Sequence, residues 1–100
     1  MERRSEKRVR WLGEAIVEGL AGGLAHDSRI ADLSVGGAFV EAVTVASPGE
    51  TVRLTFQIGT TPIQVNGEVR YAEPRIGMGV RFVDLAADSR KAIETIVAQS

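Results

Sequence analysis

Two short groups of residues have the types and spacing needed to bind a planar, charged ligand. The first is Asp32-Leu33-Ser34-Val35-Gly36-Gly37, which places a carboxylate, a hydroxyl and two glycines within six positions. The carboxylate accepts hydrogen bonds from N–H groups, the hydroxyl donates or accepts, and glycine lets a flat ring approach the backbone. The same stretch is typical of a hairpin turn in which glycine supplies a positive φ, and taken alone such a cluster is most often only a turn.

The second group is the basic arm Arg3-Arg4-Ser5-Glu6-Lys7-Arg8, in which three residues separate Arg4 from Arg8. Residues 1–10 carry a net charge of +3, whereas the rest of the chain carries −4. A guanidinium group can hold a phosphate with two hydrogen bonds, donate to guanine O6 and N7, or stack on a base. A basic arm alone is more often a solvated tail. Combined with Asp32, which complements the N1–H and N2–H₂ donors of guanine, it suits a small, doubly charged ligand.

The elements that must position these residues are mostly strands. The clearest alternation of apolar and polar residues covers 51–58, and similar patterns follow at 63–71 and 78–82. Before them, strands are predicted over 9–18, in a segment that ends near Asp32, and from Phe39 onward, with a loop over 19–27. The alternation places three aromatic side chains on inward faces: Phe56, Tyr71 and Phe82.

After the last strand the apolar period becomes helical. The pattern predicts an amphipathic helix over about 84–99, with Asp84 or Asp88 capping its start. Five or six strands followed by one helix predict a single all-β domain over residues 9–100, built as a small antiparallel barrel or a sandwich. Residues 1–8 are predicted to form a flexible arm.

The residues of this chain offer few candidates for a catalytic site or a metal-binding site. The chain has one histidine, His26, and no cysteine. A Ser-His-Asp arrangement would require Ser34, His26 and Asp32 to converge, and no nucleophile-elbow sequence surrounds Ser34. No His/Cys cluster or loop of closely spaced carboxylates suits a metal ion. We therefore predict a protein without enzymatic activity, metal or cofactor, and keep the hydrolase as an alternative.

Composition also limits the partners and the location. The net charge is −1 and only five residues are aromatic, which does not fit the stacking groove of a protein that binds polymeric nucleic acid. No apolar run approaches the ~20 residues that a membrane span needs, so no membrane insertion is expected. A secretory signal is not recognised, and the expected location is the cytoplasm.

The two polar groups together, on an all-β chain, resemble the PilZ domain family, bacterial receptor modules for the second messenger cyclic di-GMP. The resemblance rests on Arg4-x-x-x-Arg8 and Asp32-x-Ser34-x-x-Gly37 and covers nearly the whole chain, with further similarity in Val65-Asn66-Gly67-Glu68-Val69 and Gly77-Met78-Gly79-Val80-Arg81-Phe82. It implies a six-stranded antiparallel β-barrel of the split-barrel type with a C-terminal α-helix. Such a barrel would bind cyclic di-GMP against its outer surface.

The resemblance also implies roles for single residues. Arg4 and Arg8 would contact phosphates and guanine Hoogsteen edges, Asp32 and Ser34 would contact a guanine base, and Gly37 would preserve the turn. In domains that resemble this one, an arginine directly before the motif accompanies an intercalated pair of ligand molecules. Arg3 therefore favours two cyclic di-GMP molecules per chain.

The expected mechanism is an ordering of the arm. Ligand phosphates would neutralise the repulsion between its arginines, the arm would close over the barrel, and the new surface would signal to a protein effector or an attached domain. The alternative is a ligand-independent interaction module that keeps the fold and docks a protein partner.

Overall fold

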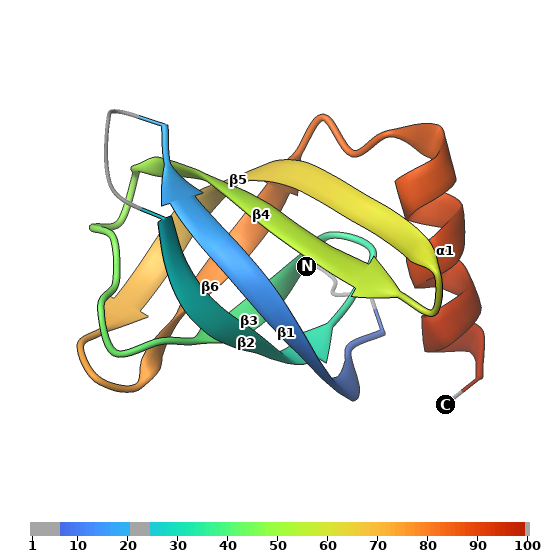
Figure 1. The fold of residues 1–100 in the computed structure, drawn as a ribbon, viewed down its shortest axis with the longest axis horizontal. Coiled ribbons are helices and arrows are strands. Elements are labelled where there is room, and N and C mark those ends of the chain that lie inside the picture. Colours follow the sequence, from blue (N-terminus) through green and yellow to red (C-terminus); the bar gives the residue numbers. More distant parts are fainter. Residues whose placement is uncertain (1–6, 21–24, 100) are drawn as a thin grey trace, which may run out of the picture.

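The fold is a closed antiparallel barrel followed by one helix (Figure 1). A computed structural model describes residues 7–20 and 25–99. Within these ranges the elements are β1 (Val9–Gly19), β2 (Ala25–Leu33), β3 (Gly37–Glu41), β4 (Thr51–Ile58), β5 (Thr61–Glu73), β6 (Gly77–Val83) and α1 (Ala87–Ala98). The strands follow the order β1-β2-β3-β6-β5-β4 around the barrel. This confirms the six-stranded barrel with a C-terminal helix.

The core is the barrel interior, filled by alternating apolar side chains. In β4, for example, Val52, Leu54 and Phe56 are buried while the residues between them face outward. The helix α1 lies across one end of the barrel (Figure 1), where Ile93 is fully buried. Because the barrel is closed, each of the described strands pairs on both sides, and none of them presents an open edge to another chain.

A β-bulge in β2 decides which way Asp32 faces. Ile30 and Leu33 are both fully buried although they lie three residues apart, a spacing that places side chains on opposite faces of a regular strand. The register between β2 and β3 shifts between Ile30 and Asp32, so that Ala31 is an extra residue. The bulge keeps Leu33 in the core and turns Asp32 to the outer surface.

A second bulge, in β5, turns Tyr71 outward, opposite to its predicted orientation. Its side chain is 58% exposed, whereas the alternation along the strand predicted an inward position. The register between β5 and β6 shifts between Val69 and Tyr71, which makes Arg70 the extra residue. The prediction was wrong because one additional residue reverses the faces of all residues beyond it.

Three further expectations need correction or lie outside the description. The helix begins at Ala87 and not at Asp84, which adopts a left-handed conformation (φ 58°) in the connection from β6; its N-cap residue is Ala86, which has no side-chain oxygen to act as a cap. His26 lies in β2 opposite Val17 and not in a loop, because pairing with β1 extends that strand back to Ala25. Most of the predicted arm, residues 1–6, lies outside the described ranges, so its flexibility stays a prediction.

No helix in the described part of the chain is long and apolar enough to cross a membrane.

Candidate ligand-binding site beside the β2–β3 turn

The turn between β2 and β3 is closed by hydrogen bonds between Ser34 and Gly37. The Ser34 N–H donates to the Gly37 carbonyl at 2.8 Å, and the Gly37 N–H donates to the Ser34 carbonyl at 3.4 Å and to Ser34 Oγ at 3.1 Å. Ser34 Oγ in turn donates to the Gly37 carbonyl at 3.3 Å. With only 1% of its surface exposed, Ser34 uses its hydroxyl to hold the turn.

Gly37 is required by close packing and not by an unusual backbone angle. A Cβ at this position would lie 2.2 Å from the carbonyl oxygen of Val80 on β6, a distance that real Cβ atoms do not reach. The Phe82 N–H also donates to the Gly36 carbonyl at 2.8 Å, which ties β6 to the turn. Neither glycine of this turn has a positive φ, so the expectation on that point was wrong: the backbones of β3 and β6 approach too closely for a side chain.

Asp32 presents a carboxylate whose orientation is fixed by the backbone. Its Oδ1 accepts a hydrogen bond from the Phe39 N–H at 3.1 Å and forms an ion pair with Arg8 Nη1. The Asp32 side chain remains 32% exposed and that of Arg8 49% exposed. The site therefore combines an oriented but accessible carboxylate acceptor with a partly exposed arginine donor at the surface.

Asp32 belongs to a row of outward-facing residues that crosses four neighbouring strand pairs. Arg10 on β1 lies opposite Asp32, Asp32 opposite Phe39 on β3, Phe39 opposite Gly79 on β6, and Gly79 opposite Tyr71 on β5. The row begins with an exposed cation, continues with the carboxylate and ends with two aromatic rings. Its composition suits a ligand that has both charged groups and flat rings.

The structure brings together some of the predicted site residues and leaves others undescribed. Arg8 and Asp32 are in contact, and Ser34 and Gly37 form the adjoining turn. Arg3 and Arg4 lie outside the described residues, and their roles stay predictions. Sequence reasoning missed Phe39 and Tyr71 as neighbours of the site. The signal available for Phe39 was its place directly after the turn, whereas the bulge that exposes Tyr71 leaves no clear mark in the sequence.

The hydrolase alternative does not find the geometry that it needs. His26 and Asp32 lie on the same strand, six residues apart, which corresponds to roughly 20 Å along an extended chain. Ser34 is buried in the turn next to Asp32. The three side chains therefore do not converge.

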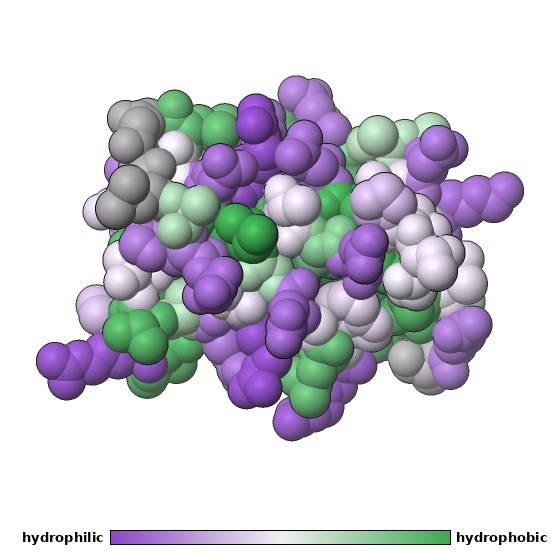
Figure 2. Space-filling view, in the orientation of Figure 1, coloured by the Kyte–Doolittle hydropathy of each residue, from purple (hydrophilic) through white to green (hydrophobic). Residues whose placement is uncertain are grey.

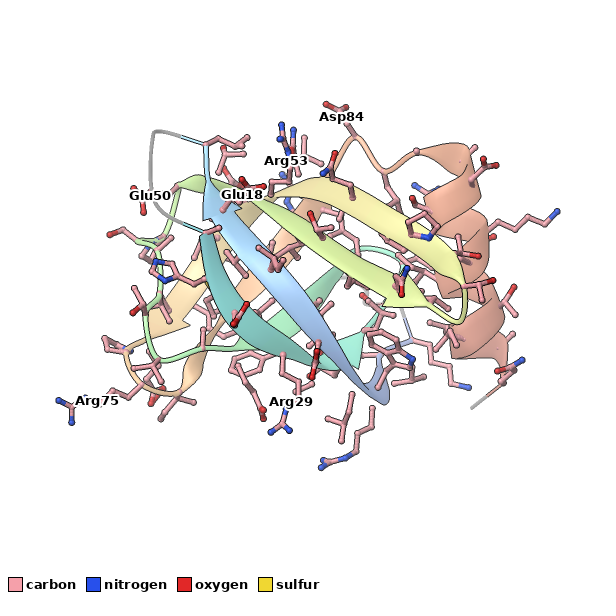
Figure 3. All side chains as sticks on the ribbon, in the orientation of Figure 1. Glu18, Arg29, Glu50, Arg53, Arg75 and Asp84 are labelled. Carbon is pink, nitrogen blue, oxygen red and sulfur yellow. The ribbon has the colours of Figure 1, made fainter. Side chains whose placement is uncertain are left out.

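Among the described residues, the candidate site lies at the surface of the barrel, where the Asp32 side chain is 32% exposed and the Arg8 side chain 49%. A broad hollow of about 1120 Å³ lies elsewhere, near the Arg29–Glu41 ion pair of 2.9 Å, and neither Asp32 nor Gly37 lines it. Charged side chains of both signs, such as Glu18, Arg53 and Arg75, point outward around the barrel (Figure 3). On the face shown in Figure 2, hydrophilic residues surround separate apolar ones. A ligand on this open outer face would need a covering segment to be enclosed.

Comparison with known proteins identifies the fold and the family. The profile described as "PilZ domain" matches residues 2–99. The inhibitor of motility from Bacillus subtilis, MotI/DgrA, is similar in structure, with a TM-score of 0.81 and 18% sequence identity over 99% of this chain. The match covers 51% of the MotI chain, so the present chain spans about half the length of that protein.

Two isolated PilZ domains are similar over most of their length. The PilZ domain of YcgR from Escherichia coli, whose structure is described as containing cyclic di-GMP, has a TM-score of 0.72 and 17% identity, over 98% of this chain and 91% of that one. The PilZ domain of CeSA from a cellulose-synthesizing bacterium has a TM-score of 0.70 and 17% identity, over 92% and 95%. At these identities the likeness shows the fold. Among curated proteins, none matches the chain.

Proposed function

The chain belongs to the PilZ domain family, and we propose that it is a receptor for cyclic di-GMP that binds the ligand on the outer face of the barrel beside the β2–β3 turn. The observation that carries this proposal is the contact between Arg8 and Asp32, residues 24 positions apart. It brings Arg8, the last arginine of the Arg4-x-x-x-Arg8 motif, against the carboxylate that begins the turn. The YcgR domain from Escherichia coli, whose structure is described with cyclic di-GMP, has the same fold.

In the proposed complex Asp32 recognises a guanine base. Its two oxygens can accept hydrogen bonds from guanine N1–H and N2–H₂, and a carboxylate distinguishes these donors from the acceptor groups of other bases. The Phe39 N–H holds Oδ1 at 3.1 Å, so the carboxylate does not have to be ordered when the ligand arrives. Ser34 and Gly37 support this arrangement by fixing the turn. The guanine contact expected of Ser34 stays a prediction, and its hydroxyl would have to leave the Gly37 bonds to make it.

Arg8 changes partner in this mechanism. In the structure it pairs with Asp32; in the proposed complex it would turn to a phosphate or to the Hoogsteen edge of guanine, as Arg4 would. An exposed ion pair of this kind is worth about 0–1 kcal/mol, so exchanging it for a bidentate phosphate contact costs little. Arg3 would contact a second, intercalated ligand molecule. Closure of the arm over the ligand would create the surface that signals to an effector or an attached domain in the cytoplasm.

The test is a calorimetric titration of the chain with cyclic di-GMP, with GTP as the control nucleotide. We expect saturable binding of cyclic di-GMP and much weaker binding of GTP. Two ligand molecules per chain would support the role proposed for Arg3, and one would remove the stacked pair while keeping the receptor. Absence of binding by calorimetry and by equilibrium dialysis would overturn the proposal and favour the interaction module.

A further inference from the structure

We propose that the outer face across β1, β2, β3 and the β5–β6 turn is an interface for a second copy of this chain, related to the first by a two-fold axis. This face surrounds the broad hollow, which neither Asp32 nor Gly37 lines. The inference does not depend on the binding of cyclic di-GMP, so it holds or fails independently of the proposed receptor function.

Exposed apolar side chains gather at this hollow. Among the large hydrophobic side chains that are exposed in the described residues, three line it: Val43 is 75% exposed, Ile76 54% and Ile16 44%. Apolar residues are visible at the lower left of Figure 2, where Figure 3 labels Arg75. Single apolar residues are normal on a protein surface, but several around one concavity are typical of a protein interface.

The turn that carries Arg75 and Ile76 is held in place by backbone hydrogen bonds to the loop after β3. Arg75 has a positive φ of 72°, which is unfavourable for a residue with a side chain. Its N–H donates to the Val43 carbonyl at 3.1 Å, and the Ala42 N–H donates to the Ile76 carbonyl at 3.3 Å. These bonds fix two loops side by side, with Val43, Arg75 and Ile76 all exposed. Costly backbone conformations of this kind recur at functional positions.

Four charged side chains around the hollow alternate in sign across the face. Glu14 on β1 lies opposite Arg29 on β2, and Arg29 lies opposite Glu41 on β3. Glu41 lies opposite Gly77 at the start of β6, directly after the turn that carries Arg75. All four charged residues line the hollow. From β1 to the β5–β6 turn this charged row is therefore negative, positive, negative and positive.

The charged row is complementary to its own reversed copy. A two-fold axis through its centre reverses the order of the second copy, so that each positive group meets a negative one. Glu14 of one copy would then face Arg75 of the other, and Arg29 would face Glu41. Arg29 and Glu41 already pair within the chain at 2.9 Å, whereas Glu14 and Arg75 have no ion-pair partner among the described residues. The two ends of the row are the charges left for a partner.

A second copy is favoured over a partner of opposite charge because the face carries both signs. The hollow is lined by three carboxylates and two guanidinium groups, the third carboxylate being that of Asp27, which lies opposite Ile16. A partner attracted by charge alone would meet a face of one sign. The net charge of the chain is −1, so little overall repulsion opposes the association of two copies. We therefore expect a reversible dimer.

The test is sedimentation equilibrium of the full chain without ligand, at concentrations up to about 1 mM, the range of weak protein association. We expect the average mass to rise with concentration from 10.7 kDa toward twice that value. Arg75→Glu and Glu14→Arg each place like charges together at both ends of the row, and each should weaken dimerisation about tenfold or more. Arg90→Glu, at an exposed arginine of α1, makes the same charge change away from this face and should leave dimerisation unchanged.

A mixture of the two single variants tests the pairing itself. In a dimer of one Arg75→Glu chain with one Glu14→Arg chain, both ends of the row again pair opposite charges, so the mixture should recover close to the original affinity. Such recovery requires that both variants are folded. A mixture of Arg90→Glu with Glu14→Arg keeps two arginines together at one end and should associate more weakly. A mass that stays at 10.7 kDa throughout, or a mixture no tighter than its components, would overturn the proposal while leaving the receptor intact.

Discussion

Asp32 and Phe39 lie opposite each other on β2 and β3, and the Phe39 N–H donates to Asp32 Oδ1 at 3.1 Å. The position of the carboxylate is therefore fixed by the pairing of β2 with β3 and not by the conformation of the side chain alone. A charged acceptor that is already oriented loses less conformational entropy on binding. The same contact links the carboxylate to β3, where the ring of Phe39 lies 6.3 Å from that of Tyr71 on β5.

Replacing Arg8 with alanine should weaken cyclic di-GMP binding by about 2–5 kcal/mol, since the arginine bridges ligand charge in a partly desolvated site. The free energy of unfolding should change by less than about 1 kcal/mol, because the Arg8–Asp32 pair is exposed. Calorimetry and urea denaturation measure the two effects. Arg90→Ala, at an exposed arginine of α1, is the matched control. Unaltered affinity in Arg8→Ala would contradict the exchange mechanism.

A comparison of Asp32→Ala with Asp32→Asn separates the role of the Asp32 carboxylate in ligand recognition from its role in stabilising the fold. Asparagine keeps an oxygen that can accept from the Phe39 N–H, whereas alanine leaves this donor without its acceptor. We expect both variants to lose about 1.5–3 kcal/mol of ligand binding, because each removes a charged acceptor of guanine donors. Only Asp32→Ala should also lower the free energy of unfolding, by about 1 kcal/mol. Equal destabilisation in both variants would show that the Phe39 contact does not support the turn.

Ser34→Ala tests whether the hydroxyl holds the turn or touches the ligand. It removes the Oγ that donates to and accepts from Gly37 in a buried position, and we expect a loss of about 1–2 kcal/mol in the free energy of unfolding. The affinity for cyclic di-GMP should fall less than in Asp32→Ala. A large loss of affinity with no loss of stability would instead favour the direct guanine contact.

Gly37→Ala should destabilise the fold by about 1–3 kcal/mol, the usual cost of an atom forced into a packed region, because the new Cβ would meet the Val80 carbonyl oxygen at 2.2 Å. Thermal or urea denaturation measures this. Gly49→Asn is a useful comparison, since a Cβ there meets nothing within 4 Å and any cost comes from the positive φ of 93°, which asparagine adopts more readily than most residues. If Gly37→Ala were as stable as the original chain, the close approach of β3 and β6 would not be needed.

The sequence predicted well where one face of a strand is regularly apolar and poorly where the register shifts. The pattern around Val52, Leu54 and Phe56 predicted β4 correctly, because residues that are apolar at every second position share one face only in a strand. The same logic failed at Tyr71, where the bulge at Arg70 depends on how β5 pairs with β6 and not on local composition. For the site, residue types identified the Asp32–Gly37 turn. The separate roles of the residues in this turn could not be predicted, because the burial of Ser34 and the hydrogen bond from Phe39 to Asp32 depend on tertiary contacts.

The bulges at Ala31 and Arg70 also make the number of residues in β2 and β5 a determinant of which side chains reach the outer surface. Each extra residue shifts the register of its strand, so that the residues after it face the opposite side of the sheet from the one that regular alternation would give them. A chain lacking Ala31 would have to bury Asp32 or expose Leu33, and one lacking Arg70 would have to bury Tyr71. A single codon gained or lost in either strand would therefore change which side chains face outward, without the replacement of any side chain.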